Sequence, residues 1–162
     1  MITEKNRLTI ELVPSTVWYA SVYQYYKKQQ TPQKWQEIKN ELFVREGRTC
    51  WICGEEHSRL EAHEFWSYDD TNHIQKLEAI HHLCGFYHKI KHIGLWLHTT
   101  DGENMLKKER LTKTDIINHF CKVNDCTRTD FQESEDEAFK IWNERSKHQW
   151  MQDFGQFSAK MM

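Results

Sequence analysis

The residues of this chain that could bind metal or move protons gather between Cys50 and His92. Cys50 and Cys53 form a Cys-x-x-Cys hook with Gly54 directly behind it, and Cys84 follows after a gap of 30 residues. Seven of the ten histidines lie in the same stretch. Histidine is only intermediate in its tendency to be buried, so core packing does not explain this concentration. The spacing is typical of a metal site.

The segments around these residues predict a hairpin followed by a helix. Residues 59–66 alternate like a strand, residues 69–72 have turn chemistry, and residues 74–80 read as a returning strand. From Leu83 to His92 the spacing becomes helical, so that Cys84, His88 and His92 fall along one stripe. The local prediction is a ββα unit clamped by the cysteine hook.

A divalent metal in such a unit can support phosphodiester hydrolysis. A histidine on the hairpin takes a proton from water, while the metal polarises the phosphoryl group and stabilises the departing oxygen. Histidine suits the role of base because its ordinary pKa lies near neutral pH. His63 occupies the predicted first strand, and His88 and His92 lie one helical turn apart on the predicted helix.

Composition indicates an ordered α+β protein. The chain has 162 residues, enough for one domain over 1–162 with a real core, and it is 38% hydrophobic. Only six Gly and two Pro argue against an all-β fold. The formal net charge of −2 provides no global basic field, so any contact with DNA must be local.

The sequence contains no predicted signal peptide or membrane-spanning stretch. We therefore expect a cytoplasmic protein without membrane contact. Five cysteines in an intracellular chain are thiols or metal ligands rather than disulfides. Cys121 and Cys126, which lie outside the central stretch, are expected to pack as small hydrophobic residues.

Further elements are predicted on both sides of the central stretch. Residues 8–13 alternate like a short strand, and Thr31-Pro32 begins an amphipathic helix over 32–46. The polar residues 99–104 predict a loop, and threonine caps predict helices within 112–147. The aromatic residues from Val17 to Tyr26 would cover the core or, alternatively, stack on bases.

The central motifs resemble those of the HNH endonucleases, the His-Me finger or ββα-metal superfamily. The resemblance rests on Cys-x-x-Cys-Gly from Cys50, Leu-Glu-Ala-His-Glu-x-Trp-x-Tyr-Asp from Leu60, and Leu-Cys-x-x-Tyr-His-x-x-Lys-His-x-Gly from Leu83. It is strongest over 35–95, with the core at 50–95. The segments 118–126 and 142–146 are also similar to the ends of bacterial and phage HNH-like proteins of this size.

The resemblance implies a role for each matching residue. His63 matches the general base, and His88 and His92 match ligands of a catalytic divalent metal, which would be Mg, Mn, Ni or Zn. A structural zinc ion is implied at three cysteines, namely Cys50, Cys53 and Cys84. The implied fold is a central ββα-metal finger with a zinc knuckle, packed by an N-terminal strand and helix and by C-terminal helices.

Three positions depart from the family pattern. Ala62 replaces the metal-binding residue before the base, Ala79 replaces an Asn, and Tyr87 replaces the fourth zinc cysteine. A carboxylate ligand would then come from Glu64, Asp69 or Asp70; alternatively, His63 would bind the metal and Glu64 would be the base. The fourth zinc ligand stays open among four histidines, namely His57, His81, His82 and His88, although the His81-His82 pair is expected to be solvated.

These residues predict two alternative functions, one as an enzyme and one as a binding protein. The first is a metal-dependent HNH-type endonuclease that hydrolyses DNA. The alternative is a degenerate HNH scaffold, encoded by a phage or mobile element, that binds a host protein, a nucleotide ligand or nucleic acid without cutting. A zinc-stapled interaction module that lacks the second metal is a variant of this alternative.

Overall fold

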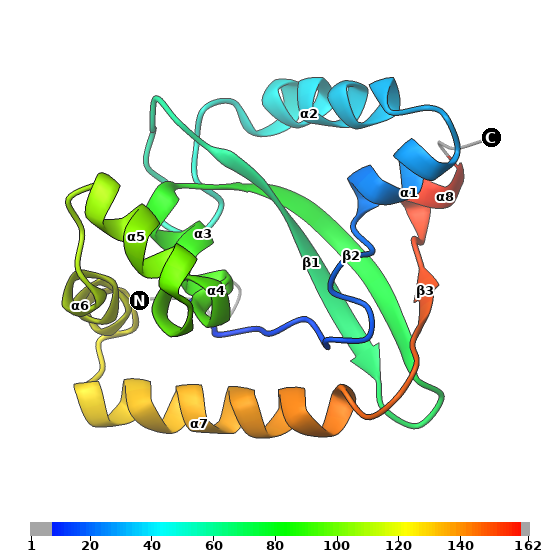
Figure 1. Ribbon diagram of the computed structural model, residues 1–162. Helices are drawn as coiled ribbons and strands as arrows, with labels where there is room; N and C mark the ends of the chain where they lie inside the picture. The colour runs from blue at the N-terminus through cyan, green and yellow to red at the C-terminus, as the bar shows by residue number, and fades with distance from the viewer. Residues whose placement is uncertain (1–7, 160–162) are drawn as a thin grey trace.

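A computed structural model describes residues 8–159 as an α+β fold, in which a long hairpin runs between groups of helices (Figure 1). The strands are β1 (Glu61–Asp69), β2 (Ile74–Leu83) and β3 (Met151–Asp153). The helices are α1 (Val22–Lys28), α2 (Gln33–Glu46), α3 (Gly85–Lys91), α4 (Ile93–His98), α5 (Thr100–Lys108), α6 (Lys113–Asn124), α7 (Arg128–Arg145) and α8 (Gln156–Ala159). None of the helices within residues 8–159 combines the length and apolar character that a bilayer span requires.

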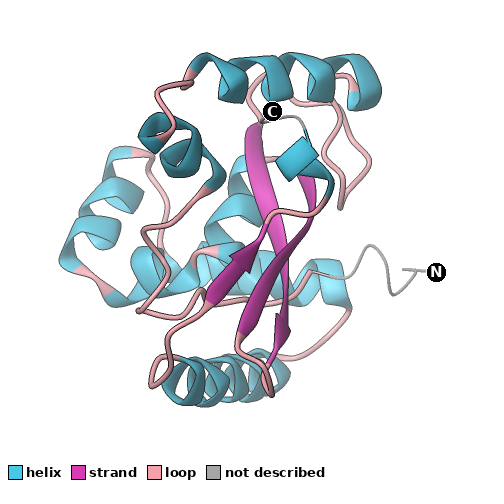
Figure 2. Ribbon diagram, turned by 90° about the vertical axis from the view of Figure 1, so that its right-hand side faces the viewer, coloured by secondary structure: helices cyan, strands magenta, loops and turns pink. Residues whose placement is uncertain are grey.

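The sheet has the strand order β1-β2-β3 (Figure 2). β1 and β2 pair antiparallel from Glu61 opposite Leu83 to Asp69 opposite Ile74, with a register shift between Phe65 and Trp66. β3 adds to β2 in parallel. The sequence did not predict β3, because three residues are too few to show an alternating pattern. The hairpin and α3 follow one another in the predicted order, and α3 packs against both strands.

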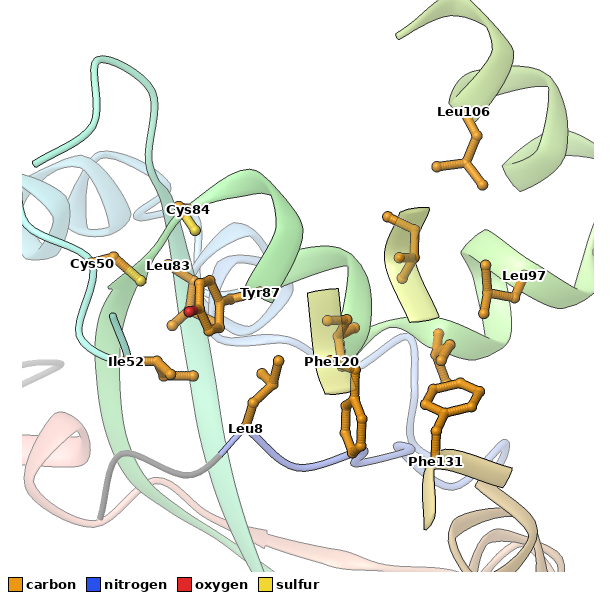
Figure 3. Packing of buried hydrophobic residues seen from close by; sticks show 13 residues of the cluster. Leu8, Cys50, Ile52, Leu83, Cys84, Tyr87, Leu97, Leu106, Phe120 and Phe131 are labelled. Atoms are coloured by element: carbon orange, nitrogen blue, oxygen red, sulfur yellow. The ribbon is translucent and has the colours of Figure 1, made fainter. Parts of the chain in front are cut away.

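Two hydrophobic clusters fix the hairpin between the helices. The larger one contains Leu83 and joins the cysteine hook to residues of α3, α4, α5, α6 and α7. In Figure 3, Cys50 and Cys84 lie at one end of this cluster and Phe131 at the other. The second cluster contains Leu77 and Ile80 of β2 and packs them against α1 and α2. β2 therefore supplies side chains to both clusters, as a strand with alternating faces can.

The predicted helix boundaries are largely confirmed. α2 begins within one residue of the predicted start, although the Thr31 hydroxyl donates to the Tyr26 carbonyl instead of capping the helix. Thr112 caps α6 and Thr127 caps α7, and each forms a capping box with an aspartate three residues later. The sequence predicted threonine caps for both helices but left open Thr112 or Thr114 for α6 and Thr127 or Thr129 for α7.

Two predicted elements are wrong. Residues 8–13 are not a strand; this segment is extended and is held by the Asn124 side chain, which bonds the N–H and the carbonyl of Leu8. Residues 99–104 are not a loop, because they form the start of α5. The Thr99 hydroxyl caps that helix by accepting from the Gly102 N–H at 2.9 Å.

Gly102 permits the close crossing of α4 and α5. A Cβ at this position would overlap the carbonyl oxygen of Leu95 and lie 2.8 Å from the Cα of Trp96. Backbone atoms cannot rotate away as a flexible side chain can. The close approach explains why a glycine stands in the first turn of a helix, where it otherwise costs about 1 kcal/mol relative to alanine.

We expect Gly102→Ala to lower the free energy of unfolding by about 1–3 kcal/mol, because α4 and α5 must separate. Gly94→Ala is the matched control, since its Cβ would meet Leu12 Cδ2 at an ordinary 3.5 Å. That variant should be neutral or more stable than the wild type. Urea unfolding followed by circular dichroism measures both changes, and equal stability of the two variants would contradict the close crossing.

Candidate functional site

Three histidines from the hairpin and α3 form one cluster. His63 lies on β1, His88 on α3, and His92 at the C-terminal end of α3. One ring nitrogen from each lies within 4.8 Å of the other two. The ring centroid of His63 is 5.7 Å from that of His88 and 5.0 Å from that of His92. The structure thus brings together the predicted base and both predicted helical ligands.

Local structure positions these side chains. The N–H of His88 donates to the Cys84 carbonyl and that of His92 donates to the His88 carbonyl, so one helical turn places the two rings edge to face beside each other. Their ring centroids are 4.6 Å apart. His63 enters from the edge strand of the sheet, where only one neighbouring strand is paired with it. Its side chain is 8% exposed.

Burial keeps all three imidazoles neutral near pH 7. It is the main reason why the pKa values of His88 and His92 fall to about 4, and nearby Lys89 and Lys91 add to the effect on them. The pKa of His63 is also well below its ordinary value, first through burial and then through His92 and His88. Neutral imidazoles present free lone pairs, which is the form that binds metal or accepts a proton.

Lys91 places a cation beside the histidine cluster, and no motif in the sequence assigned this residue to the site. Its ammonium group is buried and donates to the Thr9 hydroxyl at 2.6 Å, and it pairs with the Glu11 carboxylate at 3.2 Å. Burial lowers the pKa of Lys91, and the Glu11 carboxylate opposes this shift. The partners come from the N-terminal segment, so no local pattern in the sequence indicated the arrangement.

A pocket of about 250 Å³ opens beside the cluster. The three histidines and Lys91 form part of its wall, and aromatic side chains form much of the rest, namely Trp18, Tyr23, Trp35, Trp66 and Tyr68. Trp18 is 69% exposed. Part of the aromatic segment between Val17 and Tyr26 therefore lines this pocket, whereas Val22 and Tyr26 are fully buried and cover the core.

Glu64 lines the same pocket but does not pair with His63. Its carboxylate accepts hydrogen bonds from the Val22 N–H at 2.9 Å and from the Trp66 indole N–H at 3.2 Å. It thereby ties the N-terminus of α1 to β1. Burial raises its pKa to about 7, against the effect of these two donors. A carboxyl group that titrates near neutral pH is also suited to proton transfer.

The structure does not bring the aspartates of the hairpin turn to the histidine cluster. Asp69 lies six residues beyond His63 on the same strand, or about 20 Å at the usual rise. Its carboxylate accepts from the backbone N–H groups of Thr71 and Asn72. Asp70 pairs with Arg145. The expectation that Asp69 would share a metal with His88 and His92 is therefore corrected, and among the described residues no carboxylate belongs to that cluster.

The three cysteines of the predicted knuckle form a second cluster. The sulfur atoms of Cys50, Cys53 and Cys84 all lie within 4.8 Å of one another. Gly54, with a φ of +73°, lets the chain turn back so that its N–H donates to the Cys50 carbonyl. A hydrogen bond from Cys84 favours the Cys50 thiolate and lowers the pKa of Cys50. Three convergent thiols fit a soft ion such as zinc.

The neighbouring histidines His81 and His82 are not solvated, contrary to expectation. His81 lies 2.6 Å from the Glu46 carboxylate and stacks on Trp51. His82 is 2% exposed and bonds to the Gly47 carbonyl through Nδ1 at 3.0 Å. Both rings therefore attach the end of α2 to β2, a long-range role that their position in the sequence did not indicate.

The raised pKa of Glu64 generates a prediction about stability. In the unfolded chain this carboxyl ionises near 4.5, whereas in the folded protein it keeps its proton to about pH 7. Through Glu64 alone, the free energy of unfolding falls as pH rises between these values, whereas the lowered pKa values of the three histidines act in the opposite direction. The Glu64→Gln variant lacks this titration, so its stability relative to wild type should rise over the same interval. Urea unfolding at pH 4.5, 5.5 and 7 tests this; a constant difference would contradict the raised pKa.

Comparison of the chain with models of known protein families, with curated proteins and with solved structures finds no significant match. The resemblance to HNH endonucleases therefore rests on the motif residues themselves. Within residues 8–159 these residues form two separate groups that could each hold a metal ion: the thiols of Cys50, Cys53 and Cys84, and the imidazoles of His63, His88 and His92.

Proposed function

We propose that this protein is a metal-dependent HNH-type endonuclease that hydrolyses DNA phosphodiester bonds. One observation carries the proposal: a buried histidine of a β-hairpin lies against two neutral histidines of the following helix, at the wall of a pocket. Neither the hairpin nor the helix alone would provide this group. The order of the elements matches the predicted ββα unit.

His88 and His92 are the proposed ligands of the catalytic metal. A divalent cation bound there would supply positive charge to polarise the phosphoryl group and to stabilise the departing oxygen. Because imidazole nitrogens suit Zn and Ni better than Mg or Mn, and no carboxylate of the described chain joins the cluster, we expect Zn or Ni to be preferred.

His63 is the proposed general base. Its neutral imidazole would accept a proton from the attacking water, and its burial on the edge strand would hold the ring in one orientation. One ring nitrogen of His63 lies within 4.8 Å of a ring nitrogen of His88 and of His92. His63 could therefore instead be a third metal ligand, with Glu64 as the base. These two assignments predict different results for the same variants.

The cysteine cluster is the proposed site of a structural zinc. Cys84 stands at the junction of β2 and α3, so zinc at this site would fix the helix that carries His88 and His92. His88 lies in the histidine cluster and is not needed for the zinc site. The two proposed metals therefore do not compete for the same histidine.

A catalytically inactive binding protein is the second candidate. Ala62 provides no metal ligand beside His63, and the net charge of −2 gives little general attraction for DNA. The aromatic wall of the pocket would suit the base of a nucleotide ligand or an unpaired base of nucleic acid, while a host protein would contact the surface around it.

The decisive experiment measures metal binding and plasmid cleavage in the same variants. If His63 is the base, His63→Ala should keep the divalent cation and lose cleavage by about 100-fold or more. If His63 is a ligand, that variant should lose both, and Glu64→Gln should lose cleavage while keeping the cation. Full cleavage by His63→Ala would overturn both assignments.

Controls separate these effects from misfolding. His98→Ala removes a histidine that bonds to Glu135 outside the cluster, and this variant should bind the cation and cleave like the wild type. A wild-type protein that binds the cation but cleaves no DNA with Mg, Mn, Ni or Zn would contradict the endonuclease and favour the binding protein.

A further inference from the structure

Cys53 belongs to two groups of potential metal ligands. Its sulfur lies within 4.8 Å of the thiols of Cys50 and Cys84, and also within 4.8 Å of Glu55 and His57 side-chain ligand atoms. The three thiols alone leave a structural zinc one ligand short, because such sites are almost always four-coordinate. The residues adjoining Cys53 are therefore the first place to look for the missing ligand.

The distance between His57 and Cys53 fits one edge of a zinc tetrahedron. Its Nε2 lies 3.4 Å from the Cys53 sulfur. With ordinary Zn–S and Zn–N bond lengths, two ligands of one tetrahedral zinc are separated by about 3.6 Å. The observed separation is thus close to one edge of the expected polyhedron. His57 does not share a group within 4.8 Å with Cys50 and Cys84, so its side chain would rotate toward them when zinc binds.

The backbone of the hook holds His57 in this position. The His57 N–H donates to the Arg48 carbonyl at 3.0 Å, and the Cys50 N–H donates to the Glu55 carbonyl at 3.0 Å. Thr49 and Glu56 form an antiparallel bridge between the same two segments. His57 is therefore folded back over the hook by backbone bonds on both sides of the turn at Gly54.

The other candidates fit less well. His81 and His82 are bonded to Glu46 and Gly47, and His88 belongs to the histidine cluster. Tyr87, which stands where the family pattern has a cysteine, is buried in the larger hydrophobic cluster (Figure 3), and structural zinc sites use thiolate and imidazole rather than phenol. Glu55 offers a carboxylate, which structural sites rarely use.

His119 is the strongest rival to His57. Its Nε2 is buried without a hydrogen-bond partner in the described part of the chain, and its ring lies 5.1 Å from that of Tyr87 and stacks on Phe86. However, His119 shares no group of nearby ligand atoms with the three cysteines, whereas His57 already adjoins Cys53.

We propose that Cys50, Cys53, His57 and Cys84 form a Cys3His zinc site, with His57 in place of the fourth cysteine. This inference rests on the structural zinc of the proposed function but not on nuclease activity. The site takes three ligands from the hook and its turn and one from the junction of β2 and α3. Zinc would therefore join two segments that are distant in the sequence.

The test uses the full chain with cobalt in place of zinc. Absorption from sulfur-to-cobalt charge transfer reports only the thiol site, because the histidine cluster contains no sulfur. We expect one cobalt at this site in the wild type, with tetrahedral visible bands. His57→Ala should weaken metal binding by more than about 100-fold, since even changes to residues behind the ligands cost 10- to 100-fold. His57→Cys should restore binding with stronger charge-transfer absorption from a fourth sulfur.

His119→Ala and Glu55→Gln are the matched controls, and both should keep the wild-type spectrum and affinity. Unchanged affinity and spectrum in His57→Ala would overturn the assignment of His57 alone, and loss in His119→Ala instead would move the fourth ligand to His119. No charge-transfer absorption in the wild type would overturn the structural zinc itself. If His57→Ala does not fold, His57→Cys still decides, because an unchanged spectrum there would contradict the proposal.

Discussion

The positions of the thiol cluster and the histidine cluster both depend on the junction between β2 and α3. Leu83 ends the strand inside the larger hydrophobic cluster, and Cys84 begins the helix while it faces the other two thiols. The Cys84 carbonyl accepts the His88 N–H, so the same residue sets the first turn of α3. A shift at this junction would move the thiol cluster and the histidine cluster together, because α3 is too short to absorb it.

Hydrophobic packing and polar contacts have different roles around the hairpin. Hydrophobic clusters fix the orientation of the sheet relative to the helices, but they do not select one rotamer for each polar side chain. That selection comes from specific partners: Val22 and Trp66 for Glu64, and Thr9 and Glu11 for Lys91. Glu64 and Lys91 are thus fixed polar groups in a pocket wall that otherwise contains histidine, aromatic and aliphatic side chains.

The sequence predicted the elements whose signals are local. The threonine caps of α6 and α7, the hairpin turn, and the one-turn spacing of His88 and His92 depend on residues within a few positions of each other, although which threonine caps each helix was left open. It failed where distant partners decide the conformation. Residues 8–13 alternate like a strand, yet no strand within residues 8–159 pairs with them and Asn124 binds Leu8 instead. Likewise, the residue spacing that placed His63 in the site could not predict that Glu64 and Asp69 accept hydrogen bonds from other groups.

The N-terminal segment has a consequence for the timing of folding. It forms part of the pocket wall, and part of its own support comes from the end of α7 and the residue after it: Val13 bonds to Trp142 across 129 residues and Ser15 to Ser146 across 131. Contacts so far apart in the chain form late, because a long loop must close first. During synthesis on the ribosome, the histidines of the hairpin and α3 would thus emerge well before their pocket is complete. A nascent chain would carry the three histidines without the enclosure that lowers their pKa values.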